Sequence, residues 1–111
     1  MRSALILATL IPAITYADDG LVSKTLQARR TLQEFTTCDF PLTVPRIEIS
    51  KPPKGTKAIY QVSTHTIITD DPSDEILYHE IFHHLTARMS QRCRDEIMVE
   101  ALTKIALERD L

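Results

Sequence analysis

The order of apolar and polar residues predicts an opening helix followed by a small sheet. Apolar residues between positions 21 and 37 recur at roughly helical spacing: Leu21, Val22, Leu26, Leu32 and Phe35. Pro41 and Pro45 end this pattern, because proline cannot continue a helix and favours extended geometry in the residue before it. The alternation in RIEIS (46–50) and the β-branched and aromatic residues of AIYQV (58–62) and THTIITD (64–70) predict two or three strands, with the loop KPPKGTK (51–57) between them.

Two further helices are predicted after the sheet. In DDPSDE (70–75), Asp71 can cap a helix, Pro72 suits the first helical position, and Asp74 and Glu75 place negative charge where the helix dipole favours it. We expect this helix to span about 72–90 and a last helix to span about 94–109. The order helix, sheet, helix, helix predicts one α+β domain in which both long helices pack on one face of the sheet.

The first 17 residues have the pattern of a secretory signal peptide. Arg2 supplies a positive charge, an apolar run extends from Ala4 to Ile14, and Thr15 and Ala17 place small residues before a cleavage site. The run is shorter than the roughly 20 residues of a membrane span, which disfavours an uncleaved anchor. We therefore expect cleavage after Ala17, a single domain over residues 18–111, and a secreted or periplasmic protein with no membrane association after cleavage.

The two cysteines, Cys38 and Cys93, both follow the predicted signal peptide. An even number of cysteines in an oxidising compartment favours a disulfide bond. Such a bond closes a loop of about 55 residues and contributes on the order of 4 kcal/mol in the chain-entropy model. The alternative, in which Cys93 is a zinc ligand or a nucleophile, lacks the accompanying CxxC spacing.

Composition narrows the possible partners. The chain has 111 residues, of which 43% are hydrophobic and 25% charged, as in ordinary globular proteins. Its formal net charge is -2, and its lysines and arginines are scattered along the sequence. We therefore expect neither nucleic acid nor an anionic membrane as a partner.

The helix predicted at 72–90 contains the motif HExxH, formed by His79, Glu80 and His83. Residues four apart on a helix lie nearly above one another, so His79 and His83 can direct ring nitrogens at one metal ion. A zinc-bound water has a pKa of about 7, and Glu80 can take its proton as general base. His84 points about 100° away from His83 on an ideal helix, which favours a supporting or surface position. The motif predicts a catalytic site with one zinc ion per chain.

A catalytic zinc ion needs a third protein ligand and one open position. The metzincin pattern requires Gly and His at the third and sixth residues after the second histidine, where this chain has Thr86 and Met89, so that class is excluded. The predicted last helix offers three acids instead: Asp95, Glu96 and Glu100. Glu96 and Glu100 share one strip of that helix, so one could bind zinc while the other forms a hydrogen bond with a ligand histidine.

With HExxH followed by an acidic helix, the chain resembles a minimal gluzincin over about residues 58–105. Gluzincins are the zinc metallopeptidases of the zincin superfamily in which a glutamate on a following helix completes the site. Their usual interval is closer to the sixteen residues between His83 and Glu100 than to the twelve before Glu96, and Glu100-Ala101 resembles the start of their glutamate helix. An acid four residues after the ligand, also frequent in the family, favours Glu96. Glu100 is therefore the expected ligand, Glu96 the alternative and Asp95 the third choice.

The resemblance implies an exported zinc metallopeptidase that hydrolyses a peptide or amide bond in a peptide or protein substrate. An edge strand near 58–69 could hold that substrate by strand addition. Larger family members stabilise the oxyanion with a histidine or tyrosine from a subdomain after the glutamate. Only eleven residues follow Glu100 here, so Tyr60 and His65 on the sheet are the candidates, unless they are simply a core tyrosine and a strand histidine. The competing hypothesis is a non-catalytic, zinc-containing binding protein, and a protein partner could complete the cleft in either case.

Overall fold

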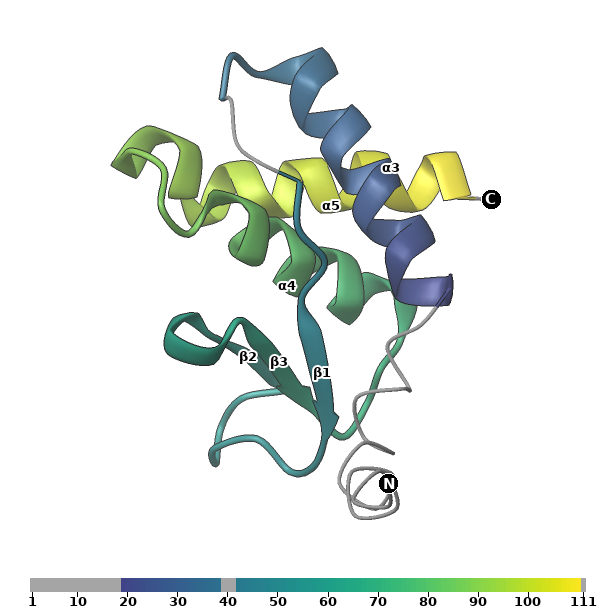
Figure 1. Cartoon of the computed structure of the whole chain (residues 1–111), viewed down its shortest axis with the longest axis vertical. Coiled ribbons are helices and arrows are strands. Elements are labelled where there is room, and N and C mark those ends of the chain that lie inside the picture. Colours follow the sequence, from purple (N-terminus) through teal and green to yellow (C-terminus); the bar gives the residue numbers. More distant parts are fainter. Residues whose placement is uncertain (1–18, 39–41, 111) are drawn as a thin grey trace, which may run out of the picture.

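The computed structural model of the protein describes residues 19–38 and 42–110 (Figure 1). The predicted signal peptide lies outside these residues. The described part is a small α+β fold with three α-helices, a three-stranded sheet and two short 3-10 helices, which confirms the predicted fold class. In chain order its elements are α3 (Asp19–Phe35), β1 (Arg46–Ile49), β2 (Ala58–Gln61), η1 (Val62–Thr64), β3 (Thr66–Thr69), α4 (Asp74–Thr86), η2 (Gln91–Arg94) and α5 (Glu96–Asp110).

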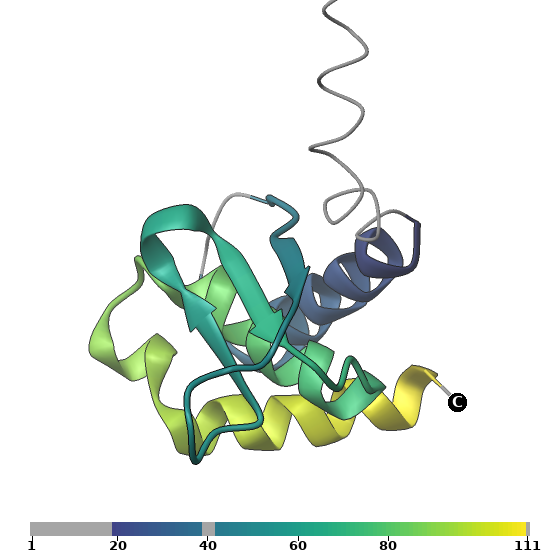
Figure 2. The ribbon, with the colours of Figure 1, turned by 90° about the horizontal axis from the view of Figure 1, so that it is seen from below.

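The sheet has the order β1-β3-β2, with β1 parallel and β2 antiparallel to β3. Ile67 on the central strand pairs with Ile47 on one side and Tyr60 on the other, and both isoleucines are buried. Figure 2 shows the three strands side by side over α4. The outer edge of β2 pairs with no strand in the described part of the chain.

The helix α4 lies at the centre of the molecule. It packs on β2 and β3, while α3 and α5 pack on α4 and on each other. The expectation that both long helices cover one face of the sheet was wrong for α5. The reason lies in α4 itself, because its buried residues extend around much of the helix: Tyr78, Glu80, Ile81, Phe82, His84, Leu85 and Thr86. A helix buried on several sides needs neighbours on several sides.

The helix α4 begins with a different cap from the one predicted. Ser73 is the N-cap residue, with an extended backbone, and its side chain accepts a hydrogen bond from the Ile76 backbone N–H at 3.5 Å. Asp71 contributes only backbone groups: its N–H donates to Thr69 Oγ1 and its carbonyl accepts from the Ser73 N–H. The helix also ends at Thr86, earlier than predicted, because a turn and the 3-10 helix η2 occupy the residues before α5.

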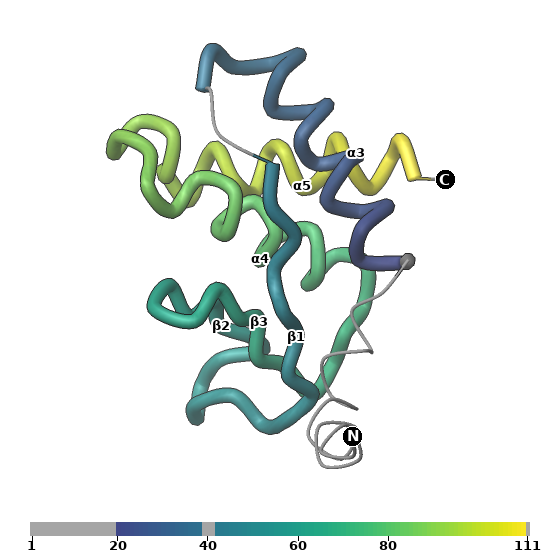
Figure 3. Tube along the Cα trace, viewed as in Figure 1, coloured from purple at the N-terminus to yellow at the C-terminus, as the bar shows by residue number. Residues whose placement is uncertain are grey.

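The predicted disulfide bond between Cys38 and Cys93 is present, with the two Cα atoms 6.1 Å apart. It joins the segment after α3 to η2, and therefore ties the first helix to the connection between α4 and α5. Figure 3 shows how the chain beyond residue 42 then crosses α4 before it enters the sheet. None of the helices in the described residues is both long and apolar enough to cross a bilayer.

Candidate metal centre

The two histidines of the HExxH motif face the same point in space. His79 and His83 lie one turn apart on α4, and their Nε2 atoms are 3.2 Å apart. Each side chain is about one quarter exposed, at 25% and 26%, so both rings border the core while remaining open to a cavity. Burial lowers the pKa of His83 and thereby favours the neutral imidazole that binds metal ions.

Glu96 completes the cluster from the first residue of α5. Its two carboxylate oxygens reach one histidine each, with Oε2 at 2.7 Å from His79 Nε2 and Oε1 at 3.1 Å from His83 Nε2. The neighbouring Asp95 is engaged elsewhere, because its Oδ1 accepts the Ile97 backbone N–H at 3.0 Å. His79, His83 and Glu96 thus form a group that could hold a metal ion.

Glu100, the residue first expected as the third ligand, does not belong to this group. The end of α4 meets the start of α5 through the short connection at residues 87–95 (Figure 1). At a rise of 1.5 Å per residue, Glu100 lies about 6 Å further along α5 than Glu96. Its side chain is exposed there, whereas Glu96 is at the level of the histidines. The structure therefore places Glu96, the alternative third ligand, in the cluster with His79 and His83.

The chemistry of the donor set suits a metal ion. Imidazole nitrogens and a carboxylate oxygen are ordinary ligands of catalytic zinc. Tetrahedral zinc with metal–nitrogen distances of about 2.0–2.1 Å separates its ligand atoms by roughly 3.3 Å. The shortest contacts, 2.7, 3.1 and 3.2 Å, use both oxygens of Glu96, and with one ligand atom from each side chain the three atoms lie within 4.8 Å of one another.

Glu80 is a buried carboxyl group beside the cluster. Its side chain is 8% exposed and lines the same cavity as the two histidines. Burial raises the pKa of Glu80, the positive charge of His79 opposes this, and the Glu96 carboxylate adds to it. A carboxylate with a raised pKa is a stronger base, as a group that takes a proton from water requires.

The cavity in front of the cluster has a volume of about 570 Å³. One wall is the edge strand β2 with Tyr60, and Val62 follows it. Arg94, from η2, also lines the cavity and brings a positive charge that no sequence pattern indicated, because its position depends on the turn between the helices. The cavity is thus lined by His79, His83 and Glu96, which we call the metal-binding group, by the carboxyl group of Glu80, by the guanidinium group of Arg94 and by the edge strand β2.

His84 is held away from the cluster by a network of hydrogen bonds. Its Nε2–H donates to the Thr43 carbonyl oxygen at 2.9 Å, and its Nδ1 lies 2.7 Å from the Tyr60 hydroxyl. The same hydroxyl lies 3.0 Å from His65 Nδ1. Tyr60 therefore borders the metal cavity with its ring while its hydroxyl faces His84 and His65, and His84 supports Tyr60 without facing the metal-binding group.

Comparison of the chain with models of protein families, with curated proteins and with solved structures found no match.

Proposed function

We propose that this protein is an exported zinc metallopeptidase. The observation that carries the proposal is the convergence of His79 Nε2, His83 Nε2 and the Glu96 carboxylate, whose ligand atoms lie within 4.8 Å of one another, next to the buried carboxyl group of Glu80. Structural zinc sites are closed by four protein ligands. Three ligands beside a base and an open cavity suit a catalytic role better.

In the proposed hydrolysis, different side chains of the chain bind the metal ion and transfer the proton. Zinc in such a site acts as a Lewis acid that polarises a carbonyl group and lowers the pKa of water to about 7. Glu80 accepts the proton of the attacking water and returns it to the leaving amine. The ring nitrogens of His79 and His83 and the carboxylate of Glu96 hold the metal in place. Tyr60 lines the cavity, and its hydroxyl would have to leave its partners His84 and His65 to reach a developing oxyanion.

An extended peptide is the substrate that the cavity favours. The outer edge of β2 has no partner strand among the described residues, and β2 forms a wall of the metal cavity. Backbone N–H and C=O groups at such an edge can pair with a peptide in strand addition. A carbonyl group of that peptide would then lie beside the metal-binding group.

Export is supported by the disulfide bond, which persists in oxidising compartments, and by the predicted signal peptide.

Replacement of Glu80 by Gln tests the catalytic role directly. The amide keeps the size of the side chain but cannot accept a proton, so we expect zinc content to stay at about one ion per chain and peptide hydrolysis to fall at least about 100-fold. Hydrolysis is measured on a mixed peptide library, and zinc content by elemental analysis. Glu75→Gln is the matched control, because Glu75 lies exposed on the same helix and should keep full activity. Undiminished hydrolysis in Glu80→Gln would refute the proposed base.

A second candidate is a binding protein that holds zinc without turnover. It is favoured by one observation: the Tyr60 hydroxyl, the group nearest to an oxyanion stabiliser in the cavity, is engaged by His84 and His65. A zinc-loaded wild type that cleaves no peptide of the library, but binds peptides or a protein partner in a zinc-dependent manner, would favour this candidate over the peptidase.

A further inference from the structure

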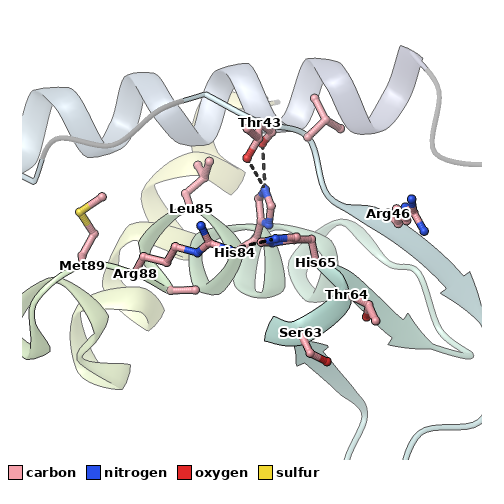
Figure 4. A pocket seen from close by; sticks show the side chains of 11 residues that line it. Thr43, Arg46, Ser63, Thr64, His65, His84, Leu85, Arg88 and Met89 are labelled. Atoms are coloured by element: carbon pink, nitrogen blue, oxygen red, sulfur yellow. Dashed lines mark hydrogen bonds between the residues drawn. The ribbon is translucent and has the colours of Figure 1, made fainter.

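A second cavity lies on the far side of the Tyr60 hydroxyl from the metal-binding group. Its volume is about 640 Å³, and it is formed by the last turn of α4, the segment before β1, and η1 with His65. Figure 4 shows its lining, with His84 at the centre and Arg88 and Arg46 toward opposite ends. The two cavities share Ala87 but no metal-binding residue, so the second cavity is a separate site.

The charges of this cavity have one sign. Arg46 and Arg88 line it together with His65, and none of its described lining residues is acidic. Neither arginine forms a salt bridge with an acid among residues 19–38 and 42–110. Other described arginines such as Arg92 also lack one, but Arg46 and Arg88 line the same cavity. Two arginines without acidic partners favour an anionic ligand, and a guanidinium group binds a carboxylate with two parallel hydrogen bonds.

The remaining lining is apolar on one side and carries hydroxyl groups on the other. Leu85 and Met89 provide an apolar wall, while Ser63 and Thr64 belong to η1 at the opposite rim. Val44 also lines the cavity. Val44 is 40% exposed, which leaves apolar surface available to a ligand. A ligand that combines a negative charge with an apolar group would satisfy both parts of the lining.

We propose that this cavity binds an organic carboxylate that carries an apolar side group. The carboxylate pairs with Arg88, and Arg46 adds attraction from the other end of the cavity. Arg88 is the stronger anchor, because its guanidinium already lies beside the ring of His65, with Nη2 at 3.4 Å from His65 Nε2. Leu85 and Met89 receive the apolar group.

This cavity is linked to the metal cavity by a continuous series of hydrogen bonds. Arg88 donates to His65 Nε2, which leaves His65 Nδ1–H to donate to the Tyr60 oxygen, and the Tyr60 hydroxyl donates to His84. A carboxylate that pairs with Arg88 competes with the first of these bonds. Binding in the second cavity therefore alters the surroundings of Tyr60, which borders the metal-binding group.

The test uses N-acetyl-leucine as the probe and N-acetyl-leucinamide as its uncharged counterpart. The full, disulfide-bonded protein is titrated in the absence of zinc, so that the carboxylate cannot bind a metal, and backbone and histidine signals are followed by NMR. We expect saturable binding of the acid, with shifts centred on residues 84–89, and at least tenfold weaker binding of the amide. Equal binding of the two compounds, or no saturable binding of the acid, would contradict the proposal.

Variants of the arginines test the anchor. Arg88→Gln should weaken binding of N-acetyl-leucine at least tenfold and Arg88→Lys by less, because lysine keeps the charge but not the paired hydrogen bonds. Arg46→Gln should weaken it severalfold and serves as the test if Arg88→Gln does not fold. Arg30→Gln, at an exposed position on α3, is the control and should change the affinity by less than twofold. Unchanged affinity in both Arg88→Gln and Arg46→Gln would rule out this site, whatever the outcome for zinc or hydrolysis.

Discussion

At the scale of single residues, the imidazole of His84 connects the sheet to the central helix. The side chain is 7% exposed, and both ring nitrogens have partners, with Thr43 on one side and Tyr60 on the other. Burial lowers the pKa of His84, so the ring is neutral at pH 7. Since Nε2–H donates to a carbonyl oxygen, Nδ1 must accept the hydrogen bond of the Tyr60 hydroxyl.

Removal of that hydroxyl has a predictable effect on stability. Tyr60→Phe leaves His84 Nδ1 buried without a partner, so we expect the free energy of unfolding to fall by about 1–3 kcal/mol. Zinc affinity should not change, because Tyr60 is not a ligand. Thr64→Val is the control: the Thr64 hydroxyl is exposed and donates to the exposed side chain of Gln61, so its removal should be nearly neutral. Urea denaturation measures both, and equal losses would contradict the assignment of the His84 hydrogen bond.

The candidate ligands differ in how far the sequence could predict them. The pairing of His79 with His83 follows from helical periodicity alone, and the structure places both rings as that periodicity requires. The choice between Glu96 and Glu100 depends instead on the path of the chain between two helices, which periodicity does not describe. A turn and a 3-10 helix in that connection decide which acid reaches the histidines.

At the scale of elements, helix ends were harder to predict than helix positions. Each predicted helix exists, but α4 is capped by Ser73 two residues after the predicted cap, and it ends before the predicted boundary. Asp, Ser and Thr are all good caps, and DDPSDE offers several of them within a few residues. The packing of α5 on α4 could not be predicted either, because it depends on which sides of α4 are buried.

The cap of α4 can be tested by two alanine variants. Ser73→Ala should lower the free energy of unfolding by about 0.5–1 kcal/mol, since it removes the side-chain acceptor of the Ile76 N–H. Asp71→Ala should cost less, because the interactions of Asp71 in this region use its backbone. Thermal denaturation of the two variants gives the comparison, and a larger loss in Asp71→Ala would mean that the predicted cap was correct after all.

At the scale of the whole molecule, the disulfide bond connects the segment after α3 to η2 in a fold with a small core. It closes a sequence separation of 55 residues and fixes η2, the turn that immediately precedes Asp95 and Glu96. The bond was predictable from two cysteines that both follow a predicted signal peptide. Its closeness to Glu96 follows from the sequence, because Cys93 stands three residues earlier, but the contact of Glu96 with the two histidines depends on how α4 and α5 pack.

Replacement of both Cys38 and Cys93 by Ser tests this double role. The chain-entropy model predicts a loss of about 4 kcal/mol in the free energy of unfolding. Zinc affinity should also fall, because the turn that positions Glu96 is no longer tied to the rest of the molecule. Chemical denaturation and zinc titration measure the two effects, and an unchanged stability would show that the helices alone hold η2 in place.

The central claim is that His79, His83 and Glu96 together bind a zinc ion, and the zinc affinities of two glutamate variants test it most directly. Both are measured by competition with a chromophoric chelator. Mutation of a residue that only supports a ligand typically lowers metal affinity by roughly 10–100-fold, and loss of a ligand itself should lower it further. We therefore expect Glu96→Ala to weaken zinc binding by at least about 100-fold. Glu100→Ala should stay within about twofold of the wild type, because Glu100 is exposed and lies outside the metal-binding group. Equal affinities in the two variants, or a greater loss in Glu100→Ala, would contradict the site described here.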